Sequence, residues 1–101
     1  MQPNDAIPLI DVEWAPAGFF GMLREGTFDP IAFARCELLL RSIEVSDEAP
    51  LPRRFVAVTW YMPLFMSWQI ERVQEKGGDV PALKRAIDRV EGILEDVLGI
   101  P

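Results

Sequence analysis

Apolar residues recur at helical spacing along most of this chain. The segment 80–98 has the clearest pattern, because its apolar positions are three or four residues apart: Leu83, Ile87, Val90, Leu94 and Val97. Such a repeat places apolar side chains on one face of a helix. Asp79 and Gly99 are residue types that commonly begin and end helices, so we predict a helix over 80–98.

Two shorter helices are predicted in the first half of the chain. Pro16 and Gly26 suit the first turn and the end of a helix over 16–25. Asp29 suits the start of a second helix over 30–45, in which apolar residues again recur every three or four positions. Both segments are therefore expected to bury one face against the rest of the molecule.

The most apolar stretch, FVAVTWYMPLFMSW over residues 55–68, contains a proline near its middle. Its second half has a helical repeat, whereas its first half is rich in Val, Thr, Trp and Tyr, which favour strands. A lone strand over 54–61 would leave its backbone groups unpaired, and the one stretch that could pair with it contains Pro8. We therefore predict one long helix over 53–76, kinked at Pro63, with a short strand at 54–61 as the alternative.

These elements predict a single all-α domain over residues 1–101. We expect four helices in an orthogonal or bundle-like arrangement around the long, kinked central helix. A loop is predicted over 46–52 and an extended N-terminal arm over 1–15. A strand at 54–61 would instead make the fold α+β. A chain of 101 residues can bury such a core without a metal or a disulfide.

The central helix is apolar on every side, so other helices must bury it. Three short helices cannot cover every side, and we expect aromatic residues of this helix to face a partner in part. The residues concerned are Trp60, Tyr61, Phe65 and Trp68. Aromatic side chains are enriched in protein interfaces. The alternative is that the whole segment is core.

The chain carries a net charge of −6, and residues 1–50 supply all of it with nine acidic and three basic residues. Acidic surface repels nucleic acid and anionic lipid and attracts basic proteins. A membrane-spanning helix needs about 20 apolar residues, and the stretch over 55–68 is shorter. We therefore expect a basic protein as the partner, with no nucleic acid and no membrane. The alternative is that the charge only keeps the chain soluble.

The residue types offer little chemistry. The chain has no histidine and one cysteine, so the commonest general base and the usual zinc ligands are missing. Cys36 lies on the apolar side of a predicted helix, and we expect it to be buried. Carboxylates one turn apart, such as Glu91 and Glu95, fall on polar helix faces and are expected to be solvated. We predict no enzyme activity, no metal and no cofactor.

The single cysteine and the lack of a recognisable signal peptide favour the cytoplasm. There we expect a small acidic protein-binding module, like the bacterial immunity proteins and antitoxins that cover the active cleft of a basic enzyme. The expected acidic binding residues, which act with the aromatic anchors, are Glu37, Glu44, Asp47 and Glu48.

Two alternative functions remain open from the sequence. The first is a homo-oligomeric scaffold or regulatory subunit, whose partner is a second copy of the chain. The second is a carrier of a small apolar ligand, held in a pocket at the Pro63 kink that Trp60, Phe65 and Met66 would line. Both would use the apolar excess of the central helix, as the protein-binding module does.

Overall fold

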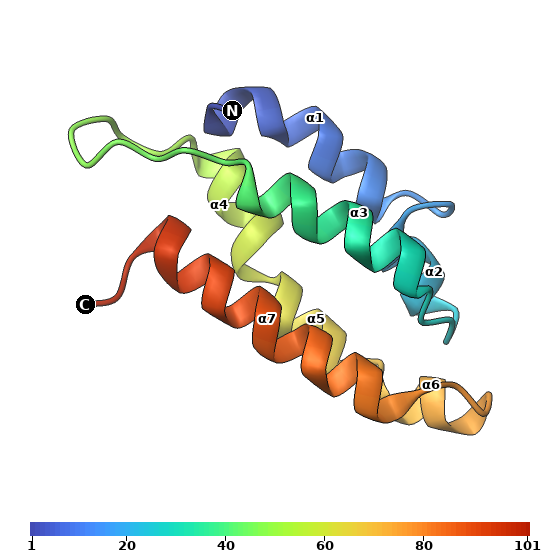
Figure 1. Ribbon diagram of the computed structural model, residues 1–101. Coiled ribbons are helices and arrows are strands. Elements are labelled where there is room, and N and C mark those ends of the chain that lie inside the picture. The colour runs from blue at the N-terminus through green and yellow to red at the C-terminus, as the bar shows by residue number, and fades with distance from the viewer.

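The computed structural model describes all 101 residues and is all-α: 69% of the residues are helical and no strand is present. The helices labelled in Figure 1 are α1 (Pro3–Trp14), α2 (Phe19–Arg24), α3 (Pro30–Arg41), α4 (Arg53–Trp60), α5 (Met62–Trp68), α6 (Ile70–Glu75) and α7 (Val80–Leu98). Residues 54–61 lie in α4 and at the turn that follows it, so the alternative α+β fold is wrong.

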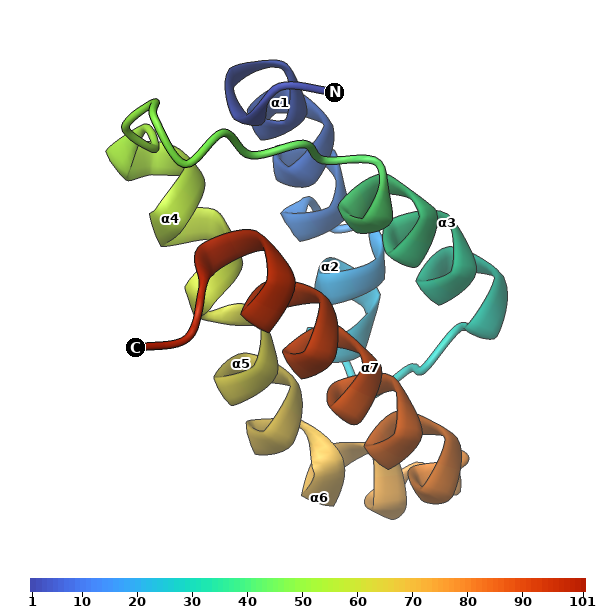
Figure 2. The same cartoon turned by 60° about the vertical axis from the view of Figure 1, so that its left-hand side comes forward.

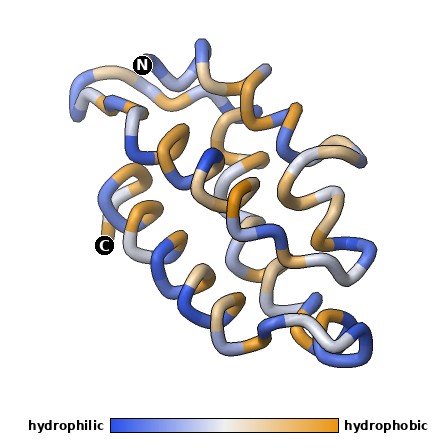
Figure 3. Tube along the Cα trace, turned by 45° about the vertical axis from the view of Figure 1, so that its right-hand side comes forward, coloured by the Kyte–Doolittle hydropathy of each residue, from blue (hydrophilic) through white to orange (hydrophobic).

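Helices distant in the sequence lie side by side. Helix α7 runs along α5 and α6, and α1 packs against both α3 and α4 (Figures 1 and 2). Apolar and polar positions alternate along the helices at the helical repeat (Figure 3). The apolar positions meet in one core of 22 buried residues, to which every helix contributes.

Residues 3–14 form α1, so the prediction of an extended arm is wrong. Pro3 lies in the first turn, where its missing N–H costs nothing. Pro8 is exposed, so the backbone carbonyl that it leaves without a partner can be hydrated. The buried face of α1 consists of Pro3, Ala6, Ile10 and Glu13. A charged residue within this face conceals the apolar repeat in the sequence.

The segment Pro3–Arg24 has the length and the apolar composition of a membrane-spanning helix. It is two helices, however, because the chain turns at residues 15–18 between α1 and α2. In addition, 44% of its most apolar stretch is buried inside the protein. Core helices of soluble proteins share these properties, so the segment is weak support for a membrane location.

The apolar segment predicted as one helix over 53–76 consists of α4, α5 and α6, separated by single residues, Tyr61 and Gln69. Both of these residues have helical backbone angles. Each carbonyl accepts a backbone hydrogen bond from the helix that follows it, at 2.9 Å from Phe65 N–H to Tyr61 and at 3.0 Å from Val73 N–H to Gln69. Pro63 lies in the first turn of α5, where no N–H is needed.

The other predicted helices are present, two of them shorter than expected. Helix α7 has the predicted bounds, whereas α3 ends at Arg41 and α2 begins at Phe19. The predicted N-caps form, because the carboxylate of Asp29 accepts two backbone N–H bonds of α3 and that of Asp79 accepts one of α7. The segment 42–52 is thus a longer connection than predicted, and it leads directly into α4.

Candidate functional site

A row of large side chains lies exposed on α4 and α5. Trp60, Leu64 and Trp68 are four residues apart and therefore share one helix face. Their exposed fractions are 54%, 39% and 59%. Tyr61 lies half-buried between the two tryptophans, with ring centroids 5.6 Å from Trp60 and 5.7 Å from Trp68. We call these four residues the aromatic row.

The aromatic row has a base of packed rings, which Tyr61 contacts at centroid distances of 6.1 Å from the partly buried Trp14 and 6.2 Å from Phe65. Phe65 lies in the core beneath it, edge-on to Trp14 at 4.9 Å between ring centroids. Trp14 stacks on Phe20 at 4.3 Å, and its indole N–H donates a 3.2 Å hydrogen bond to the Val58 carbonyl. The row is thus joined to this base through Tyr61. Phe65, which the sequence suggests as a partner-facing residue, is instead part of that base.

Three of the four predicted acidic residues lie together. Glu44, Asp47 and Glu48 are exposed in the connection over 42–52. This connection reaches the start of α4, whose length of eight residues puts Trp60 about 10 Å further along the helix. The acidic connection therefore leads into the helix that carries Trp60, and the length of α4 separates the two.

Glu37 lies elsewhere. It is on α3, with only 12% of its side chain exposed, and it forms ion pairs with Arg41 at 3.2 Å and with Arg89 of α7 at 2.9 Å. These pairs neutralise its charge and tie α3 to α7. The structure therefore does not bring Glu37 together with the other predicted binding residues.

A groove beside the aromatic row brings in carboxylates that the sequence does not single out. Trp60 and Pro63 line one side of it, and α7 lines the other side with Glu91, Leu94, Glu95, Leu98 and the following Gly99. Its volume is about 290 Å³. We call it the Trp60 groove. The four-residue spacing of Glu91 and Glu95 is visible in the sequence, but their position beside Trp60 depends on how α7 packs against α5.

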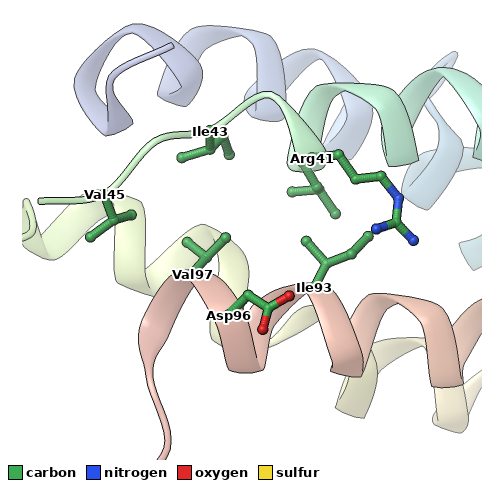
Figure 4. Close-up of a pocket in the computed structure, with 7 residues that line it drawn as sticks. Arg41, Ile43, Val45, Ile93, Asp96 and Val97 are labelled. Atoms are coloured by element: carbon green, nitrogen blue, oxygen red, sulfur yellow. The ribbon is translucent and has the colours of Figure 1, made fainter.

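A second pocket lies between the end of α3 and the end of α7, with a volume of about 220 Å³. Ile43 and Val45 point from the connection toward Ile93 and Val97 of α7 (Figure 4). Leu40 completes the apolar wall, and Arg41 and Asp96 also line the pocket. Most of its wall is continuous with the core, so this pocket offers packing space rather than reactive groups.

The ionisable groups inside the protein have structural roles. Glu13 is buried, and its carboxylate accepts two 2.7 Å hydrogen bonds from Arg35 and one of 3.0 Å from Phe19 N–H. The hydrogen bonds from Arg35 lower the pKa of Glu13, although burial opposes the shift. Burial raises the pKa of the Cys36 thiol to about 12, which leaves it unreactive at neutral pH. No three metal-ligating side chains converge anywhere in the structure.

No protein-family model, no curated protein and no solved structure matches this chain. A proposal about function therefore depends on the geometry of the surface. Its distinctive features are the aromatic row, the acidic connection and the Trp60 groove. All three involve α4, α5 or the segment that leads into them.

Proposed function

We propose that this protein is a non-catalytic binding module that acts by covering a basic protein, in the manner of a cytoplasmic immunity protein or antitoxin. The observation that carries the proposal is that Trp60 and Trp68 are each more than half exposed on one helix face. Tryptophan contributes disproportionately to the binding energy of protein interfaces. Exposed apolar surface of this kind, with Leu64 between the two rings, is characteristic of a face that a partner covers.

The charge of the surroundings favours a basic partner. The acidic connection supplies Glu44, Asp47 and Glu48 at one end of α4, and the Trp60 groove adds Glu91 and Glu95. Acidic groups around an apolar centre attract a basic partner over a long range and align it before contact. In this proposal the aromatic row supplies most of the affinity, and the carboxylates supply speed and selectivity.

We further propose that α4, α5 and α6 work as one central rod, bent near Pro63, in a single bundle-like domain. The helical backbone angles of Tyr61 and Gln69 support one rod. Helices α1, α3 and α7 would surround this rod, which gives a four-helix arrangement in which the short α2 links α1 to α3. Such a scaffold would keep the aromatic row in a fixed geometry and so limit the entropy lost on binding.

A second copy of the chain is the alternative occupant of the aromatic row. The same exposed tryptophans support it, because homodimer interfaces are apolar. A carrier of a small apolar ligand has less support, because Phe65 and Met66 belong to the core and Trp60 alone of the expected pocket residues lines the groove. Both alternatives are separable from the main proposal by one experiment.

The experiment places a photo-crosslinking amino acid at Trp68 or, as a control, at Ile31, which is exposed at the start of α3. Crosslinking in the native cell at 68 but not at 31 is expected to identify one basic protein. Crosslinks between two copies would favour the scaffold, and recovery of a lipid alone would favour the carrier. Equal crosslinking at both positions would contradict a specific face.

Binding kinetics with the purified partner then test the two roles. Charge reversal of Glu44, Asp47 and Glu48 to lysine should slow association at low salt, with a smaller effect as added salt screens the charges. Trp60→Ala or Trp68→Ala should instead speed dissociation. Unchanged kinetics in both sets of variants would refute the proposal.

A further inference from the structure

The Trp60 groove combines three kinds of surface. Leu94, Leu98 and Pro63 supply apolar wall, Trp60 supplies an aromatic wall, and Glu91 and Glu95 supply two carboxylates. Trp60 is more than half exposed, so its ring is accessible to an incoming group. The groove is therefore an open slot with an apolar lining, an aromatic side and an anionic side.

The two carboxylates of this groove have no cationic partner within the protein. The four ion pairs of the structure involve Asp11, Glu13 and Glu37 but neither Glu91 nor Glu95. Being four residues apart on α7, Glu91 and Glu95 also repel one another, as like charges at this spacing do. A cation between them would relieve that repulsion.

Taking these features together, we propose that the Trp60 groove is the receptor site for an arginine or lysine side chain of the partner, arginine being preferred. This inference rests on the proposed function, since it names the chemistry of the partner at the same surface. The methylene groups of a basic side chain would lie along Leu94 and Leu98. Its charged head would contact Trp60 and the two carboxylates.

Other occupants fit the groove less well. An apolar side chain would remove water from Glu91 and Glu95 without supplying a counter-charge, and an acidic one would be repelled. Arginine is preferred to lysine because its planar guanidinium can stack on an indole and donate to two carboxylates at once. The α3–α7 pocket of Figure 4 lacks this selectivity, because Arg41 and Asp96, which both line it, carry opposite charges.

The test uses N-acetyl-arginine amide as the probe and the indole N–H resonance of Trp60 as the reporter in an NMR titration. N-acetyl-citrulline amide, which has nearly the same shape without the charge, is the matched ligand control. We expect a saturable shift at Trp60 with the arginine probe only. A shift of equal size and midpoint with the citrulline probe, or no shift with the arginine probe, overturns the inference.

Variants distinguish binding of the arginine probe in the groove from general attraction to the acidic surface. Glu91→Gln combined with Glu95→Gln should weaken the arginine probe by about fivefold or more, the effect of losing exposed ion pairs. The same double change at Glu71 and Glu75, another exposed pair four residues apart on α6, should leave binding unchanged. Equal weakening by both double variants would overturn the inference.

Failure of this inference can be told from failure of the proposed function. If the arginine probe does not bind but Trp68→Ala still speeds dissociation of the partner, the groove assignment is wrong and the binding function stands. If the probe binds as expected and crosslinking at Trp68 yields no basic protein, the groove assignment stands and the proposed function is wrong.

Discussion

The Glu13–Arg35 pair makes an asymmetric prediction about stability. Only 4% of the Glu13 side chain is exposed, whereas 53% of the Arg35 side chain is exposed. Removal of the arginine therefore leaves a buried carboxylate without its counter-charge. Removal of the carboxylate leaves an arginine that water can still reach. We expect the change at the more exposed residue to be the more damaging one.

The magnitude follows from the state of Glu13 in Arg35→Ala. An uncompensated buried charge costs about 3–5 kcal/mol. Glu13 can limit this cost by taking a proton, which at pH 7 requires about 3–4 kcal/mol, at about 1.4 kcal/mol per pH unit above the ordinary glutamate pKa. The uncompensated Glu13 carboxylate should thus lower the free energy of unfolding by about 3–4 kcal/mol. Glu13→Gln keeps an acceptor for Phe19 N–H and should cost about 1–2 kcal/mol.

Urea unfolding at pH 7, followed by circular dichroism, measures these differences. Arg41→Ala is the matched control, because 54% of the Arg41 side chain is exposed and its partner Glu37 retains Arg89. The control should cost less than about 1 kcal/mol. The deficit of Arg35→Ala should also shrink as the pH falls toward 5, because protonation of Glu13 becomes easier. The reasoning is refuted if Arg35→Ala costs no more than Arg41→Ala.

Three further predictions concern groups whose environment the structure defines. The pKa of Glu13 is lower in the folded state than in the unfolded state. Its contribution to stability is therefore complete above the unfolded-state pKa and is lost as the pH falls through the folded-state pKa. The stability advantage of the wild type over Glu13→Gln should narrow below about pH 4.5 in urea titrations. Leu94→Ala should cost about 2–5 kcal/mol and Glu95→Gln less than about 0.5 kcal/mol in the same assay, and equal losses would contradict the orientation of α7. Cys36, with a thiol pKa of about 12, should react with Ellman's reagent no faster than the protein unfolds, and rapid modification of the folded protein would contradict its burial.

The local signals in the sequence predict the parts of the fold that depend on local interactions. The bounds of α7 follow from its repeat and from Asp79, whose carboxylate accepts the Ala82 N–H at 3.0 Å. The start of α3 follows in the same way from Asp29. In each case residues within one turn of helix carry the information.

Helix α1 could not be predicted in this way. Glu13 lies on its buried face, where Arg35 reaches it from 22 residues away in the chain and neutralises its charge. Pro8 further weakens the local helical signal, although its exposed position makes it harmless. The stability of α1 therefore depends on tertiary contacts that no local pattern reports.

The candidate site is predictable in part for the same reason. The four-residue spacing of Trp60, Leu64 and Trp68 places them on one face, but only the packing of α1 and α7 decides that this face is exposed. Phe65 is an aromatic residue in the same apolar segment, but it lies in the core. The sequence thus identifies the helix that carries the exposed aromatics, and the structure selects the residues.

Counting charges along the sequence does not show where acidic surface remains after folding. Residues 1–50 carry the whole net charge, yet three of their acids, Asp11, Glu13 and Glu37, are ion-paired. Two of the partners, Arg54 and Arg89, come from the second half of the chain and neutralise acids of the first half. The nominally neutral second half is consequently left with carboxylates that nothing in the protein neutralises, Glu91 and Glu95 among them. Acidic surface available to a partner is therefore determined by which charges remain unpaired after folding, and it includes the Trp60 groove although the charges of that half of the chain sum to zero.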